Sequence, residues 1–122
     1  MIVKGLHVLA EIHDCDEKLL QDLNQLESLV KDAAGENGFV VEDSVFHQFS
    51  PSGISGVVVA PNANLSIHTW PEGCVTVDMV TCRGDINPIA SCESLVSKFR
   101  ASHMTATSRE RDINLGAVAL AV

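Results

Sequence analysis

Apolar and polar residues alternate along several stretches of this chain and recur at helical spacing along two others. Period-two alternation, or a high content of β-branched and aromatic residues, predicts six strands, at residues 4–13, 39–49, 54–60, 65–70, 74–82 and 103–111. Apolar residues at intervals of three or four predict two helices, each with one buried face. Their apolar positions are Leu19, Leu23, Leu26, Val30 and Ala33 in the first helix, and Ile89, Cys92, Val96 and Phe99 in the second.

Capping and turn residues separate these predicted elements. Asp14 followed by Glu17 matches a capping box that would start the first helix. Asn87 followed by Pro88 predicts the start of the second helix, with Asn as cap and Pro in the first turn. The other breaks contain Gly, Pro, Ser or Asn, at residues 35–38, 50–53, 61–64, 71–73 and 83–85.

The order of these elements predicts an α+β fold, a two-layer α/β sandwich with a mostly antiparallel sheet and both helices on one face. A length of 122 residues predicts one domain over residues 1–122. The run Val57-Val58-Val59 places apolar side chains on both faces of its strand. We therefore expect the second face of the sheet to be buried too, and a sheet from a partner subunit is one way to bury it.

Composition and charge narrow the function classes. The 8 Lys and Arg against 16 Asp and Glu give a net charge of −8 without a basic cluster, which argues against nucleic-acid binding. The longest apolar run, residues 117–122, is far shorter than the roughly 20 residues of a membrane-spanning helix. The start has no signal-peptide pattern, so we expect a cytoplasmic protein without a membrane partner. Neither the four cysteines nor the histidines show metal-ligand spacing, and no metal is expected.

Several motifs together carry a family resemblance. They are Gly53-Ile54-Ser55-Gly56-Val57-Val58-Val59, Leu65-Ser66-Ile67-His68-Thr69-Trp70-Pro71-Glu72 and Val77-Asp78-Met79-Val80-Thr81-Cys82, with Gly5-Leu6-His7-Val8-Leu9-Ala10-Glu11 and Phe46-His47-Gln48-Phe49-Ser50-Pro51. On these residues the chain resembles prokaryotic S-adenosylmethionine decarboxylase from about residue 5 to residue 88, and only loosely beyond. The His-Thr-Trp-Pro-Glu segment is a specific signature of that family.

The resemblance implies a small dimeric enzyme that decarboxylates S-adenosylmethionine for spermidine synthesis, using a pyruvoyl group made from its own chain. In that family the serine of a Glu-Ser-His tripeptide attacks the preceding carbonyl, and the resulting ester eliminates, which cuts the chain. The corresponding residues here are Asn62, Ala63 and Asn64. Because the methyl group of Ala63 has no oxygen to attack a carbonyl, we expect neither self-processing nor a cofactor.

Three further residues match catalytic positions of the family. The resemblance implies that His68 moves a proton during processing, which suits an imidazole near neutral pH. It also implies that Cys82 reprotonates the substrate carbon and that Ser55 lies beside the site. The structural alternatives are a hydrogen-bonded strand histidine for His68 and a plain buried thiol for Cys82, as we expect for the other cysteines.

The resemblance also implies a substrate pocket. Its residues are Phe49, Leu65, Trp70 and Glu72, which would offer aromatic surfaces to adenine and a carboxylate to the two ribose hydroxyls. A lone tryptophan is more often a core residue than a ligand platform, and only its place between His68 and Glu72 makes the two readings of Trp70 equal. Glu72 reads equally well as a solvated loop charge.

The favoured hypothesis is a non-catalytic or regulatory relative that binds S-adenosylmethionine or an analogue, as a homodimer or a heteromer with an active paralogue. One alternative is an active decarboxylase with an atypical processing site. Ser55 and Ser66 are the nearby hydroxyls, and we expect Ser66 to be held in a strand ladder. Another alternative is a structural protein that uses the fold only for dimerisation.

Overall fold

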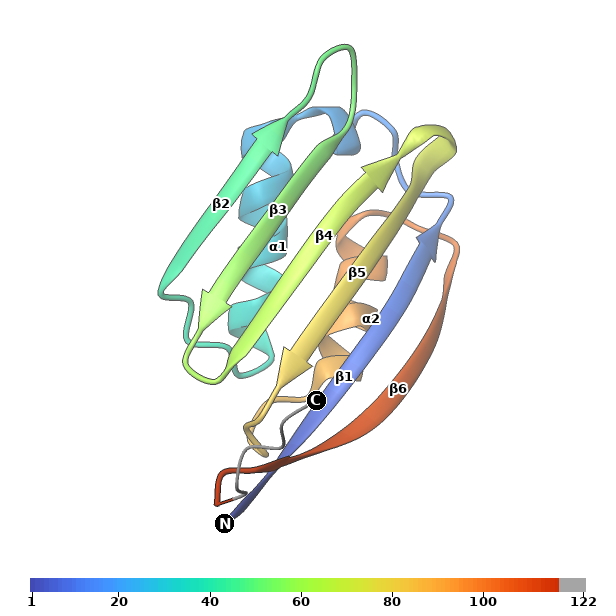
Figure 1. Cartoon of the computed structure of the whole chain (residues 1–122). Helices are drawn as coiled ribbons and strands as arrows, with labels where there is room; N and C mark the ends of the chain where they lie inside the picture. The colour runs from blue at the N-terminus through green and yellow to red at the C-terminus, as the bar shows by residue number, and fades with distance from the viewer. Residues whose placement is uncertain (117–122) are drawn as a thin grey trace, which may run out of the picture.

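Six antiparallel strands form one sheet in the computed structural model, which describes residues 1–116 (Figure 1). The strands are β1 (Ile2–His13), β2 (Asp43–Gln48), β3 (Ile54–Ala60), β4 (Ala63–Trp70), β5 (Cys74–Thr81) and β6 (His103–Asn114). Their spatial order is β2-β3-β4-β5-β1-β6. The apolar run at residues 117–122 lies outside the described residues.

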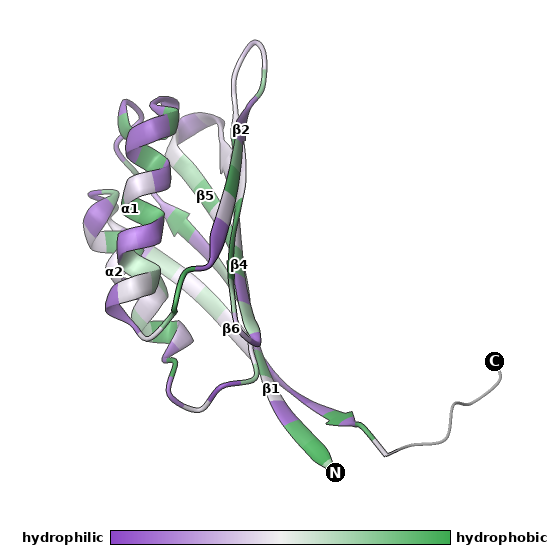
Figure 2. Cartoon of the chain, turned by 90° about the vertical axis from the view of Figure 1, so that its left-hand side faces the viewer, coloured by the Kyte–Doolittle hydropathy of each residue, from purple (hydrophilic) through white to green (hydrophobic). Residues whose placement is uncertain are grey.

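Two α-helices cover one face of this sheet, and the other face is open (Figure 2). They are α1 (Leu23–Glu36) and α2 (Pro88–Lys98), and two short 3-10 segments, η1 (Leu19–Gln21) and η2 (Pro71–Gly73), lie in the connections. The predicted α+β sandwich with both helices on one face is therefore confirmed. No helix among residues 1–116 is long and apolar enough to cross a membrane.

Strand alternation decides which side chains enter the core. Along β5, Val75, Val77 and Met79 face the helices and are almost completely buried, whereas Thr76 and Asp78 face the open side and are half-buried. The same alternation holds in β4, where Leu65 and Ile67 are buried. The core is therefore the single layer between sheet and helices.

The open face carries apolar side chains as well as polar ones. Val57 is half-buried, and Leu9, Val45 and Val59 are 47%, 64% and 44% exposed. Nothing within the described chain covers these residues. Burial of the second face thus remains a prediction about an additional molecule.

The first helix begins later than the Asp14–Glu17 pattern predicted. Asp22 is its cap, and the Asp22 carboxylate accepts a hydrogen bond from the Gln25 N–H at 3.1 Å. Asp14 instead has a positive φ of 59° and accepts a hydrogen bond at 2.7 Å from the Ser102 hydroxyl. The predicted capping box was therefore wrong, because Asp14 ties the end of β1 to the segment that enters β6.

The second helix begins as predicted. The Asn87 side chain accepts a hydrogen bond from the Ala90 N–H at 3.0 Å, and Pro88 occupies the first turn. Phe99 follows the helix and is completely buried. Local capping chemistry was sufficient here because the Asn87 side chain bonds within its own helix.

Strand boundaries differ from the predictions in both directions. β2 begins only at Asp43, since Phe39 lies in the core after α1 and its N–H donates to the Ala34 carbonyl at 3.0 Å. β4 begins at Ala63, two residues early, because Pro61 and Asn62 alone form the turn after β3. β1 and β6 each extend further than predicted, and they pair with each other over their whole length.

Candidate active site

A row of polar residues crosses the open face in cross-strand register, near the end of the sheet where β4 finishes. Ser55 on β3 lies opposite His68 on β4, and His68 lies opposite Thr76 on β5. Ser55 Oγ and His68 Nδ1 share a hydrogen bond at 2.7 Å. This bond fixes the imidazole and leaves Nε2 as the ring nitrogen that can exchange a proton with a ligand.

Two exposed aromatic side chains flank this row. Trp70, at the end of β4, is 54% exposed, and its Nε1–H donates to Thr76 Oγ1 at 2.9 Å. Phe49 follows β2, is 49% exposed, and meets the ring of His47 edge-on with centroids 4.5 Å apart. Large aromatic rings usually bury most of their surface, so two half-exposed rings beside an oriented imidazole indicate a binding surface.

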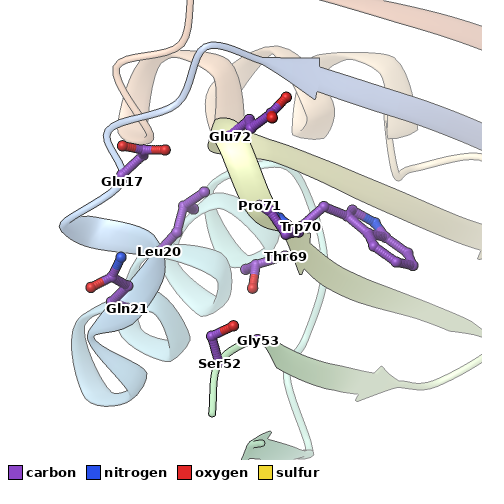
Figure 3. A pocket seen from close by; sticks show the side chains of 10 residues that line it. Glu17, Leu20, Gln21, Ser52, Gly53, Thr69, Trp70, Pro71 and Glu72 are labelled. Atoms are coloured by element: carbon purple, nitrogen blue, oxygen red, sulfur yellow. The ribbon is translucent and has the colours of Figure 1, made fainter. Parts of the chain in front are cut away.

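Glu72 lies in the tight connection between β4 and β5. Its φ is 68° and that of Gly73 is 78°, so two successive residues adopt the left-handed conformation. The carboxylate is exposed next to a cavity of about 320 Å³. Figure 3 shows that Glu17, Gln21 and Ser52 lie on one side of this cavity, while the Trp70 indole points away from them along the sheet.

Asn62 and Ala63 lie at the opposite end of β4. Asn62 has a φ of 58°, and its carbonyl accepts a hydrogen bond from the Cys82 N–H at 2.9 Å. Ala63 is 7% exposed and lies opposite both Ala60 and Thr81. The peptide between Asn62 and Ala63 is therefore held in a two-residue turn by the end of β5.

Cys82 borders a separate cavity of about 640 Å³ at this second end of the sheet. The cavity is also lined by Gly5 and Leu6 of β1 and by the cationic side chains of Lys4 and Arg83. Both cations already have partners, Asp112 at 2.7 Å and Asp85 at 2.6 Å. Among residues 1–116, no group of three or more His, Cys, Asp or Glu side chains is arranged to hold a metal ion.

The residues matched to the family site thus form two groups rather than one. Ser55, His68, Phe49, Trp70 and Glu72 gather at the end of the sheet where β4 finishes. Asn62, Ala63 and Cys82 gather where β4 starts. Ala63 and His68 are five positions apart along β4, which corresponds to about 16 Å in an extended strand.

Leu65 lies apart from both groups. Its side chain is completely buried and faces the helices, on the opposite side of the sheet from His68. Contact between Leu65 and a ligand stays a prediction.

Thr76 is a site residue that the sequence reasoning missed. Only the β4–β5 register reveals it, because an isolated threonine in an alternating strand carries no functional signal.

Comparison with known proteins gives one consistent result. A family model described as S-adenosylmethionine decarboxylase matches residues 6–112. The S-adenosylmethionine decarboxylase proenzyme of Acetivibrio thermocellus is 46% identical over 110 residues, which are 89% of each chain. That of Pelotomaculum thermopropionicum is 48% identical over 110 residues, covering 89% of this chain and 87% of the relative.

A solved structure extends the similarity to the fold. The crystal structure of the adenosylmethionine decarboxylase from Aquifex aeolicus VF5 superposes with a TM-score of 0.78 and 26% sequence identity. The superposition covers 97% of this chain and 98% of the other.

The four thiols differ in burial, and their reactivity should differ accordingly. Burial raises the pKa of Cys15 to about 11, with a smaller effect from Cys74, and burial raises the pKa of Cys92 to about 11. Burial and the Glu11 charge also raise the pKa of Cys74, which is partly exposed. At pH 8, about one in a thousand of the Cys15 and Cys92 thiols is ionised, and only thiolate reacts.

We therefore expect a disulfide reagent such as 5,5′-dithiobis(2-nitrobenzoic acid) to modify Cys82 first and Cys74 next at pH 8. Cys15 and Cys92 should react only after unfolding, or as the pH approaches 11. Peptide mass spectrometry after timed quenching assigns the order, and Cys82→Ser should remove the fastest phase. Equal rates at all four thiols would contradict this description of the site.

Proposed function

This chain belongs to the S-adenosylmethionine decarboxylase family of polyamine biosynthesis, and from this we propose that it binds an adenosyl ligand without decarboxylating it. The observation that carries the proposal is the methyl side chain of Ala63 at the start of β4, in a chain that keeps Phe49, Trp70 and Glu72 near the other end of that strand. The curated relatives are named proenzymes, and a proenzyme of this family needs a hydroxyl at the residue that becomes the pyruvoyl group. The residues at this end of the sheet therefore do not fit that group.

No neighbouring hydroxyl supplies a substitute. Ser66 is held in the ladder between Val57 and Asp78, and Ser55 is bonded to His68. The Thr81 hydroxyl lies opposite Ala63 but is 3% exposed and engaged with the Arg83 backbone. Attack by any of these hydroxyls on the Asn62 carbonyl would break the bond to Ala63 and leave an ordinary amino terminus on Ala63, not a ketone.

The other end of β4 supports ligand binding. Trp70 and Phe49 offer exposed ring faces on which adenine can stack, and the Glu72 carboxylate can accept hydrogen bonds from both ribose hydroxyls. The Ser55–His68 pair presents one oriented imidazole nitrogen next to them. The net charge of −8 favours a ligand that carries a positive sulfonium, although solubility accounts for this charge equally well.

The chain should remain intact after expression. Intact-mass spectrometry should find one species near 13.1 kDa, because Ala63 lacks the nucleophile for cleavage. We define the restored chain as the variant with Asn62→Glu, Ala63→Ser and Asn64→His, and expect it to divide into two fragments. Two fragments from the unaltered chain would contradict the proposal and favour an atypical processing site.

Adenosyl binding should depend on Glu72. Titration calorimetry with S-adenosylmethionine should detect binding to the unaltered chain, and Glu72→Gln should weaken it about 10- to 100-fold by removing charge-assisted hydrogen bonds worth roughly 1.5–3 kcal/mol. Glu93→Gln, an equal charge change on α2 behind the sheet, is the control and should leave affinity unchanged. Absence of binding at millimolar ligand would reject this function and favour a purely structural role.

A second candidate function is pairing with a subunit that can process itself, and the division of the site favours it. Ala63 and His68 are about 16 Å apart within one chain, too far to act on one ligand atom. A two-fold arrangement of two open sheet faces would bring the start of β4 in one subunit towards the end of β4 in the other. This chain would then contribute Ser55 and His68 to the site of its partner.

Co-expression should reveal such a shared site. The restored chain carrying His68→Ala should stay uncut when expressed alone and should be cut when co-expressed with the unaltered chain, whose His68 completes the site. Co-expression with a His68→Ala form of the unaltered chain is the control and should give no cleavage. Cleavage of the His68→Ala restored chain by itself would show that the two groups act within one chain.

A further inference from the structure

Trp70 combines exposure with a fixed orientation. It is the only tryptophan in the chain and is 54% exposed, yet its indole is anchored by the hydrogen bond from Nε1 to Thr76 Oγ1 at 2.9 Å. Figure 3 shows the ring directed along the sheet and away from Glu17, Gln21 and Ser52. An exposed side chain held this way has lost rotamer freedom before any ligand arrives.

The strand register places the Thr76 hydroxyl within hydrogen-bond distance of the Trp70 indole. This threonine lies opposite His68, whereas Trp70 lies opposite Cys74, so the indole reaches diagonally from β4 over β5 to meet the threonine hydroxyl. Thr76 is on the open face, half-buried and outside the core. The same three-strand row therefore contains the hydroxyl that fixes His68 and the hydroxyl that fixes Trp70.

We propose that Thr76 is a positioning residue for the adenosyl ligand: its hydroxyl presets the Trp70 indole as one wall of the ligand surface. This inference rests on the proposed function, since it concerns the same site. A freely rotating indole would have to be ordered when the ligand binds, at a cost that corresponds to about three- to tenfold in affinity. Thr76 makes this ordering unnecessary without touching the ligand.

The matched substitutions are Thr76→Val and Thr76→Ser. Valine keeps the size and β-branching of threonine but removes the acceptor, whereas serine keeps the hydroxyl. With one tryptophan, the indole N–H gives a single resonance in a ¹H–¹⁵N spectrum, and the fluorescence anisotropy decay reports on this ring alone. Thr76→Val should move the resonance and add a sub-nanosecond anisotropy component, and Thr76→Ser should do neither.

Calorimetry with S-adenosylmethionine then tests the consequence. Thr76→Val should weaken binding about three- to tenfold, Thr76→Ser should bind like the unaltered chain, and the midpoint of thermal unfolding should be similar in all three. Equal affinity of Thr76→Val and the unaltered chain, or an unmoved indole resonance in Thr76→Val, would overturn the proposal. So would a changed sedimentation coefficient without a change in affinity, which would assign the indole to a subunit contact.

These outcomes distinguish a failure of the positioning role of Thr76 from a failure of the proposed adenosyl binding. If the unaltered chain does not bind S-adenosylmethionine, the proposed function fails and the positioning role fails with it. If the unaltered chain binds S-adenosylmethionine and Thr76→Val binds it with the same affinity, the proposed function stands and only the role of Thr76 is rejected.

Discussion

The alternation of side chains in a sheet covered on one face only is the constraint on which this structure depends. Every second residue of β3, β4 and β5 enters the core, and the residues between them face outwards. The apolar set includes Val58, Leu65 and Met79, all fully buried. Register is therefore fixed by burial on one face, and the polar row on the other face takes its alignment from that register.

Sequence reasoning recovered the features that depend on local periodicity and capping. The two helices, the six strands and the Asn87 cap follow from apolar spacing and turn chemistry, which do not require knowledge of distant segments. The prediction that Asp14 caps a helix was wrong, because Ser102, 88 residues further along the chain, bonds to the same carboxylate. The predicted start of β2 was wrong for a similar reason, since Phe39 is buried in the core and its N–H bonds to the Ala34 carbonyl of α1.

The site was less predictable than the fold, for a geometric reason. The residues that match the family signature are close in sequence, but a strand extends them: β4 runs from Ala63 to Trp70 and carries members of both groups to opposite ends. Thr76 was missed because its role comes from its cross-strand neighbours and not from its own segment. The direction of the Leu65 side chain likewise follows from strand alternation, which places it in the core on the other side of the sheet from His68.

The turn at Pro61 and Asn62 connects two strands that are also joined to other strands. β4 pairs with β3 on one side and with β5 on the other, so the peptide between Asn62 and Ala63 is one of many links that hold its first residue in place. The fold is consequently tolerant of lost covalent continuity at this point, because both new ends would remain in their ladders. The strand pairing around residues 62 and 63 would therefore hold the sheet together whether or not the chain were cut at this peptide.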